Sequence, residues 1–262
     1  MIKEKMKMKM KRNIEVRNLI IGEGIPKICV PIVGESTEQL IDEIKSLKNL
    51  EVDLVEWRMD YYKEIQNLNQ ITQAVDQIRE ALGDMPLLAT FRSKKEGGQR
   101  ELNIADYIEL NKNVIATGKI DLIDVELFTG DNEVKEIVDF AHQHNVKVVM
   151  SNHDFNKTPC EEEIVKRLCK MQALNADLPK IAVMPRTPQD VLILLSATNE
   201  MNEHYADRPI ITMSMAKMGI ISRLAGEIFG SALTFGTAKV ASAPGQIEAD
   251  ELKKVLNIIH SL

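Results

Sequence analysis

Two basic side chains in the second half of the sequence could carry out chemistry on a carbonyl compound. Lys180 lies at the start of a short apolar run, Pro179–Pro185, and His153 lies near the end of another, Lys147–Phe155. A lysine that is buried beside other cations loses affinity for its proton and can form a Schiff base with a ketone or an aldehyde. Histidine titrates near neutral pH, so His153 is the natural candidate for a general acid and base.

Charged residues of both signs interrupt three other apolar runs. They are Glu56, Arg58, Arg92, Asp124 and Glu126. Alternate side chains of a strand point to opposite faces, and the apolar neighbours of these residues, such as Val55 and Trp57, occupy the other face. The charged residues therefore share one face with Lys180 and His153. Burying unpaired charges costs several kcal/mol each, so a set of this size indicates a functional site rather than separate structural ion pairs.

The elements that must position these residues follow from the periodicity, which alternates strand-like runs with amphipathic helical stretches. The eight runs are Lys27–Val33, Leu54–Asp60, Pro86–Arg92, Leu122–Leu127, Lys147–Phe155, Pro179–Pro185, Pro209–Met215 and Leu233–Thr237. This repeat predicts an α/β fold, a (β/α)8 TIM barrel, with the site at the carboxyl ends of its strands. A doubly wound sheet is disfavoured because Gly34-Glu35-Ser36, after the first run, is not a glycine-rich nucleotide loop.

The residues before the first run divide into two parts. Asn13–Gly24 is predicted to form a short β-hairpin that closes the barrel floor. Residues 1–12 contain six basic residues and one acidic residue and are interpreted as a flexible basic head. Residues 13–262 are then expected to form a single catalytic barrel domain, and deletion of the head is expected to leave the activity intact.

Composition excludes several classes of protein. The chain has 44% hydrophobic and 27% charged residues, which is typical of globular proteins, and a net charge of -6. The charge is carried by an acidic body, which argues against nucleic acid as a partner. No apolar run approaches the roughly 18 residues of a membrane span. Three cysteines without a C-x-x-C pair fit a reducing compartment, so we expect a soluble, cytoplasmic protein.

Two loops and one arginine are expected to complete the mouth of the barrel. Arg92–Gly98 contains a glycine pair typical of a mobile loop and brings Glu96 within reach of the site. Lys239–Gln246 is interpreted as a lid. Arg223 is expected early in the seventh helix, where a guanidinium suits a substrate carboxylate.

Six short motifs, all in the expected order, resemble those of type I 3-dehydroquinate dehydratases. They are Glu56–Asp60 (EWRMD), Phe91–Gly98 (FRSKKEGG), Ser151–Phe155 (SNHDF), Lys180–Pro185 (KIAVMP), Met213–Arg223 (MSMAKMGIISR) and Ser242–Gln246 (SAPGQ). The resemblance covers nearly the whole chain after residue 13. It implies a (β/α)8 barrel, usually a homodimer, that dehydrates 3-dehydroquinate to 3-dehydroshikimate in the shikimate pathway.

The resemblance also implies a role for nine residues. Lys180 would form the Schiff base, His153 would be the general acid and base, and Glu96 would pair with His153 and tune it. Arg223 would hold the substrate carboxylate. The others would bind ring hydroxyls and help close the lid: Glu56, Arg58, Arg92, Ser242 and Gln246. Because the imine is an electron sink, neither a metal nor an organic cofactor is expected.

Two alternatives remain open at this point. A class I aldolase-type barrel would share the lysine but cleave a carbon–carbon bond. Many substrates of such enzymes carry phosphate, and no glycine-rich phosphate loop follows the seventh or eighth run beyond the region of Gly236. A barrel that only binds a small acid is the second alternative, and the combination of lysine, histidine and glutamate argues against it.

Overall fold

The computed structural model describes residues 12–238 and 245–262 of the 262-residue chain. Two segments singled out in the sequence therefore fall at least partly outside the described residues. Residues 1–11 of the basic head are one, and residues 239–244 of the expected lid, with Ser242 among them, are the other.

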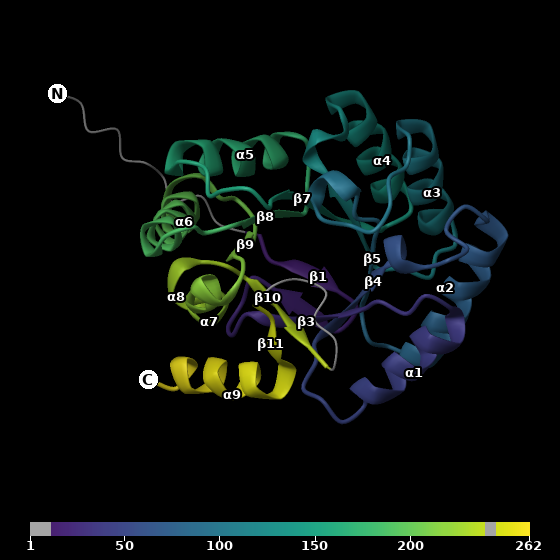
Figure 1. The fold of residues 1–262 in the computed structure, drawn as a ribbon, viewed down its shortest axis with the longest axis horizontal. Coiled ribbons are helices and arrows are strands. Elements are labelled where there is room, and N and C mark those ends of the chain that lie inside the picture. Colours follow the sequence, from purple (N-terminus) through teal and green to yellow (C-terminus); the bar gives the residue numbers. More distant parts are fainter. Residues whose placement is uncertain (1–11, 239–244) are drawn as a thin grey trace.

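Eight parallel strands form a barrel, and helices surround it (Figure 1). The strands are β3 (Lys27–Ile32), β4 (Leu54–Arg58), β5 (Leu87–Thr90), β6 (Leu122–Glu126), β7 (Lys147–Asp154), β8 (Leu178–Val183), β9 (Ile211–Ser214) and β10 (Leu233–Thr237). Each pairs with the next in the chain from β3 to β9, and β10 pairs with β3. An isolated bridge between Ile210 and Ser231 joins the residues just before β9 and β10 and closes the barrel. A short extra strand, β11 (Ile247–Glu248), pairs with β10. The predicted (β/α)8 barrel is confirmed, and every predicted run overlaps one strand.

The helices of the described residues follow the strands in the expected alternation. They are α1 (Thr37–Leu47), α2 (Leu68–Leu82), α3 (Ile104–Ala116), α4 (Asp131–Gln143), α5 (Glu161–Ala173), α6 (Pro188–Glu200), α7 (Ile220–Leu224), α8 (Gly226–Phe229) and α9 (Ala249–His260). Polar N-cap side chains begin several of them; at α6 the side chains of Thr187 and Asp190 bond to each other's backbone N–H groups in a full capping box.

The segment after β9 corrects one expectation. Arg223 was expected early in the seventh helix, but it lies in the last turn of the five-residue helix α7. The chain first makes a tight 3-10 turn, Lys217–Gly219, in which a Cβ on Gly219 would meet the Ser214 carbonyl oxygen at 2.2 Å. The helix therefore begins late, and it is interrupted at Ala225 before α8 begins.

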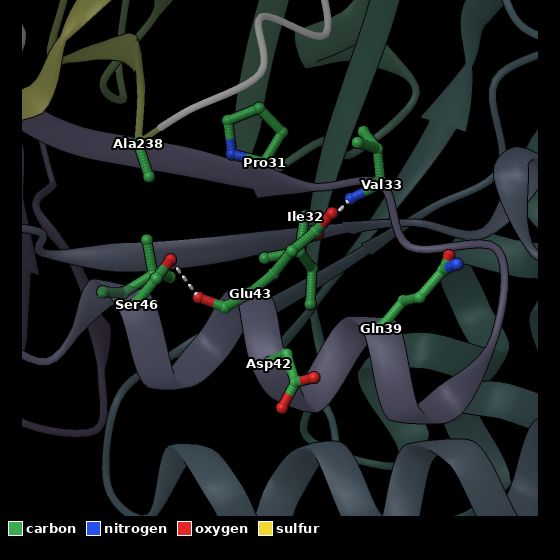
Figure 2. A pocket seen from close by; sticks show the side chains of 9 residues that line it. Pro31, Ile32, Val33, Gln39, Asp42, Glu43, Ser46 and Ala238 are labelled. Carbon is green, nitrogen blue, oxygen red and sulfur yellow. Dashed lines mark hydrogen bonds between the residues drawn. The ribbon is translucent and has the colours of Figure 1, made fainter.

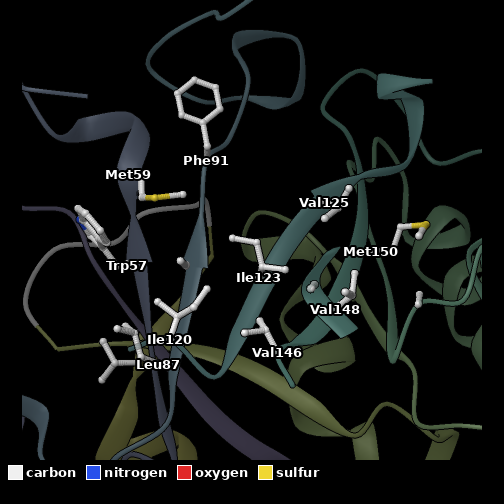
Figure 3. Packing of buried hydrophobic residues seen from close by; sticks show 14 of the residues in the cluster. Trp57, Met59, Leu87, Phe91, Ile120, Ile123, Val125, Val146, Val148 and Met150 are labelled. Carbon is white, nitrogen blue, oxygen red and sulfur yellow. The ribbon is translucent and has the colours of Figure 1, made fainter. Parts of the chain in front are cut away.

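One apolar core lies between the strands and the helices. Figure 3 shows side chains that project from the outer faces of the strands, with Trp57 beside β4, Ile123 on β6 and Met150 on β7 among them. All three are fully buried, and burying such a side chain is worth about 1.5–3 kcal/mol. Their positions alternate with those of the charged residues, so the predicted assignment of strand faces is confirmed.

A second, smaller apolar core fills the floor of the barrel. The strands β1 (Ile14–Val16) and β2 (Leu19–Ile21) form an antiparallel hairpin. The buried side chains of the hairpin pack against inward-facing residues near the starts of the barrel strands, which are Cys29, Leu54, Leu88, Leu122, Val149 and Leu178. The hairpin that was expected to close the floor is therefore confirmed, and the charged residues lie above an apolar base.

A substitution in the hairpin tests this packing. Ile21→Ala should lower the free energy of unfolding by about 2–5 kcal/mol, because the Ile21 side chain is fully buried in the floor core. Urea unfolding at equilibrium measures the change. Ile20→Ala on the same strand is the matched control; Ile20 is 41% exposed, and its loss should stay within about 0.5 kcal/mol. Equal losses at the two positions would contradict the role of the hairpin.

Candidate active site

A cavity at the carboxyl ends of the strands brings the predicted residues together. Its lining consists of Glu56, Arg58, Arg92, Glu96, Gly97, His153, Phe155, Lys180, Ala182, Met213, Met215, Arg223, Phe235 and Gln246. Eight of the nine predicted site residues are in this set, and the ninth, Ser242, lies outside the described residues. The substrate contacts that were expected of these residues stay predictions.

Lys180 lies inside the barrel near the start of β8. Its side chain is buried, with Nζ 3.9 Å from Glu56 Oε1 and 4.1 Å from the centre of the Phe235 ring. Burial lowers the pKa of Lys180; the carboxylates of Glu56 and Asp124 oppose this effect, and the nearby Arg92 adds to it. A larger fraction of Lys180 is therefore free amine at neutral pH than of an exposed lysine.

His153 and Glu96 form a buried pair. Glu96, on a 3-10 turn (Lys94–Glu96), places its Oε2 2.9 Å from Nδ1 of His153, and the same oxygen accepts the backbone N–H of His153 at 2.9 Å. Burial lowers the pKa of His153 well below its usual value, and the cations Arg92, Lys180 and Arg58 lower it further. The neutral ring is a base, and with Nδ1 bound to Glu96 its Nε2 is the nitrogen left for chemistry.

Arg92 is the centre of a network of charged groups. Its Nη1 donates to Glu126 Oε1 and to Ser151 Oγ, each at 2.9 Å, and its Nη2 donates to Asp124 Oδ1 at 2.8 Å. Nη1 also lies 3.5 Å from Glu96 Oε2. Burial lowers the pKa of Arg92, but the surrounding carboxylates outweigh burial and raise it above its ordinary value. Arg92 therefore stays charged and ties the loop after β5 to β6 and β7.

Arg58 has its own carboxylate partner, Asp60. Two parallel hydrogen bonds of 2.8 Å join the guanidinium to the two oxygens of Asp60. Asp60 also accepts the backbone N–H groups of Arg92 and Gln99, so it ties the loop after β5 to the end of β4. The sequence reasoning did not assign Asp60, although it continues the alternation of Glu56 and Arg58 and could have been found by it.

Steric constraints explain the two glycines, Gly97 and Gly98, in the loop after β5. Gly97 has a φ of +87°, and its position lies against the Phe155 ring. A Cβ on Gly98 would lie 1.8 Å from the Arg92 carbonyl oxygen, and the Gly98 N–H donates to Ser93 O at 2.8 Å. The sequence analysis interpreted these glycines as typical of a mobile loop. The structure shows that a tight turn requires them, and this turn brings Glu96 to His153.

Arg223 points into the cavity beside a sulfur atom. Its side chain is 1% exposed, and Nη1 lies 3.7 Å from Sδ of Met213. Burial lowers the pKa of Arg223 to about 10. An anionic ligand beside this guanidinium would offset the cost of burying the charge.

A second cavity lies outside the barrel (Figure 2). It is lined by Pro31, Ile32, Val33, Gln39, Asp42, Glu43, Ser46, Leu47 and Ala238. Glu43 extends from α1 and accepts the backbone N–H groups of Val33 and Gly34. The described lining contains no lysine, arginine or histidine, so it offers no amine that could form an imine.

His142 and His144 have structural partners. Nε2 of His142 lies 2.8 Å from Asp177 Oδ2, and Nδ1 of His144 lies 2.8 Å from the Phe140 carbonyl oxygen. Across residues 12–238 and 245–262, no group of three or more His, Cys, Asp and Glu side chains is arranged to hold a metal ion.

Comparison with known proteins decides the family. The family model described as Type I 3-dehydroquinase matches residues 28–262. The chain belongs to this family. It is 58% identical over 251 residues to a 3-dehydroquinate dehydratase of Clostridioides difficile, covering 96% of this chain and 98% of the relative. The 3-dehydroquinate dehydratase of Salmonella typhimurium is 55% identical over 249 residues, covering 95% and 99% of the two chains.

A solved structure agrees with this assignment. The crystal structure of a type I 3-dehydroquinate dehydratase from Clostridium difficile with covalent modified comenic acid has a TM-score of 0.94 to this chain. The two sequences are 57% identical, and the match covers 96% of this chain and 99% of the other. The resemblance inferred from the six motifs is therefore confirmed.

The environment of Lys180 generates a titration prediction. In lysine-labelled protein followed by ¹³C NMR, Lys180 should titrate at a lower pH than the exposed Lys254, because burial disfavours the charged amine of Lys180. Glu56→Gln should lower the midpoint further, since the Glu56 carboxylate raises the pKa of Lys180. A Lys180 midpoint at or above that of Lys254 would contradict the proposed effect of burial.

Proposed function

We propose that this chain removes water from 3-dehydroquinate to give 3-dehydroshikimate, a step of the shikimate pathway of aromatic amino-acid biosynthesis. The observation that carries the proposal is the buried Lys180 in one cavity with the His153–Glu96 pair, in a chain of the type I 3-dehydroquinase family. The activity is the one named for the curated relatives.

The reaction begins at Lys180. Its neutral Nζ adds to the ketone carbon of the substrate, and the carbonyl oxygen leaves as water with one proton from the amine and one from His153, which gives a protonated imine. His153 takes the proton from the carbon beside the imine carbon, and the C–H electron pair moves toward the imine nitrogen. The pair then returns to form the carbon–carbon double bond and expels the hydroxyl group, which leaves as water with a proton from His153. Hydrolysis of the imine consumes one water and releases the product and Lys180.

The other residues hold the substrate and the charges that develop. Glu96 stabilises the imidazolium that forms when His153 accepts a proton. Arg223 binds the substrate carboxylate. Five residues contact the ring hydroxyls and complete the closed site: Glu56, Arg58, Arg92, Ser242 and Gln246. The protonated imine supplies the electron sink, so the chain needs no metal and no organic cofactor for this step.

The aldolase-type alternative receives no support. Glu56, His153 and Lys180 occur together in a family match that spans residues 28–262 and names a dehydroquinase. A direct assay separates the two reactions: the purified protein should convert 3-dehydroquinate to a product with the ultraviolet absorbance of a conjugated enone, without any carbon–carbon cleavage.

We further propose a homodimer whose subunits are single barrel domains of residues 13–262, with residues 1–12 contributing nothing to the site. Exposed apolar side chains on neighbouring elements support self-association, and they are Met218, Ile220, Ile221, Ile228 and Ile258. Sedimentation equilibrium should give twice the mass of the chain; a monomer at micromolar concentration would contradict the dimer. The same protein without residues 1–12 should keep its kcat.

The location is proposed to be the cytoplasm. The structure has no helix among its described residues that is long and apolar enough to cross a membrane. Its cysteines, Cys29, Cys160 and Cys169, are all free thiols, as a reducing compartment would keep them.

A pair of histidine variants tests the catalytic assignment. His153→Gln should lower kcat by about 10²–10⁴-fold, the usual contribution of a general acid and base. His142→Gln is the matched control, because His142 is also paired with a carboxylate, Asp177, but lies outside the cavity lining. Its kcat should stay within about twofold of the unmodified protein. Steady-state kinetics with 3-dehydroquinate measures both, and similar losses in the two variants would contradict the role of His153.

A further inference from the structure

Two residues without a role so far, Asn152 and Arg167, extend the hydrogen bonds of the Glu96–His153 pair outward from the barrel. Asn152 precedes His153 on β7 and is buried. Its Nδ2 donates to Glu96 Oε1 at 3.1 Å, and its Oδ1 accepts from Nη1 of Arg167 at 2.9 Å. Arg167 belongs to α5, the helix that follows β7. A chain of hydrogen bonds therefore runs from α5 to the ring of His153.

Arg167 fixes the order of donors and acceptors along this series of hydrogen bonds. A guanidinium has only donors, whereas an asparagine side chain has a donor end and an acceptor end. Arg167 therefore holds the oxygen of Asn152 toward itself and the amide nitrogen toward Glu96. Glu96 must accept this hydrogen bond, and its second oxygen accepts from Nδ1–H of His153. The lone pair of His153 is then on Nε2, on the side of the cavity.

We propose that Arg167 and Asn152 are positioning residues, which keep Glu96 an acceptor at both oxygens and keep His153 in the tautomer with a free Nε2. This inference rests on the reaction roles proposed above for Glu96 and His153. The tautomer of His153 then depends on a residue of α5, Arg167, which lies outside the substrate cavity.

Arg167 itself is held by three neighbours. Its Nε donates to Glu163 Oε1, one turn earlier on α5, at 2.8 Å, and its guanidinium lies 5.5 Å from the centre of the Phe128 ring. Asp154 Oδ2 is 4.0 Å away. These contacts fix the guanidinium before any substrate binds, so Arg167 can determine the orientation of Asn152.

A cavity on the outer side of the pair makes the role of Arg167 testable. Glu96, Asn152, Phe128 and Arg167 all line it. When Arg167 is shortened or made apolar, water from this cavity can bond to either end of the Asn152 amide. The amide can then rotate and turn its oxygen toward Glu96, which would favour the protonated form of Glu96.

Charged and polar groups from three neighbouring parts of the barrel face Glu96. They are Arg92 after β5, Glu126 on β6, and Asn152 and His153 on β7. Burial raises the pKa of Glu96 to about 8, and Glu126 adds to this effect, whereas Arg92 and the hydrogen bonds from Asn152 and the His153 backbone oppose it. A variant of Arg167 leaves the other charged groups in place, so a change in the titration reports the orientation of Asn152.

The experiment combines kinetics with a direct view of the ring. Arg167→Met should lower kcat about tenfold while KM stays within about twofold, and the acidic limb of kcat/KM should move up by about one pH unit. The sign follows because a carboxylate that loses a donor is protonated at higher pH. ¹⁵N NMR of the histidine side chains should show His153 protonated at Nδ1 in the unmodified protein and a mixture of tautomers in the variant.

Three further variants separate positioning from folding. Arg167→Lys keeps donors without acceptors and should restore the pH profile and most of kcat. Asn152→Asp keeps a partner for Arg167 but removes the donor to Glu96, so its loss should be at least as large as that of Arg167→Met. Lys112→Met is the matched control, because Lys112 also pairs with a carboxylate, Glu136, and lies over a phenyl ring, yet contacts no residue of the pair.

The outcomes distinguish this inference from the proposed reaction. Changes in both the ¹⁵N signals and the pH profile, with recovery in Arg167→Lys, support it. Unchanged ¹⁵N signals in Arg167→Met overturn it, even if kcat falls, because Arg167 would then act only on stability. If the tautomer changes and kcat does not, the positioning stands and the catalytic role proposed for His153 is wrong.

Discussion

The buried guanidinium of Arg92 is the interaction on which the interior of this barrel depends. Barrel interiors are normally filled with branched apolar side chains, yet here Asp124, Glu126 and Glu96 surround one cation. Removing one partner from such a group typically costs about 3–5 kcal/mol, because the remaining charge is left buried without compensation. The network therefore orders these acidic side chains, and it connects the loop after β5 with two neighbouring strands.

The same arrangement makes two nitrogen bases easier to deprotonate. Burial lowers the pKa of both His153 and Lys180, and Arg92 lowers both further. Glu56 opposes the shift at Lys180, because its carboxylate favours the protonated amine, whereas burial favours the free amine that can attack. An enzyme that forms an imine needs both states, since the nucleophile must be neutral and the imine must be protonated. The apolar floor formed by the hairpin keeps this chemistry at the open end of the barrel.

Much of the fold and of the site follows from strand periodicity. The alternation that puts Trp57 on the outer face puts Glu56 and Arg58 inside, and the structure agrees. Contacts that depend on loops do not follow from it. The alternation along β7 places Asn152 on the outer face of the strand. It reaches Glu96 only because the loop after β5 folds back onto β7. The late start of α7, which places Arg223 in its last turn, depends on a close approach of backbones after β9 that no periodicity encodes.

The proposed reaction requires a covalent bond between the amine of Lys180 and the substrate. Borohydride reduction in the presence of 3-dehydroquinate, followed by peptide mass spectrometry, tests it most directly, because reduction converts a transient imine into a stable secondary amine. One adduct is expected, on Lys180, together with loss of activity, and no adduct when substrate is omitted. Continued dehydration of 3-dehydroquinate under these conditions, with Lys180 unmodified, would contradict it.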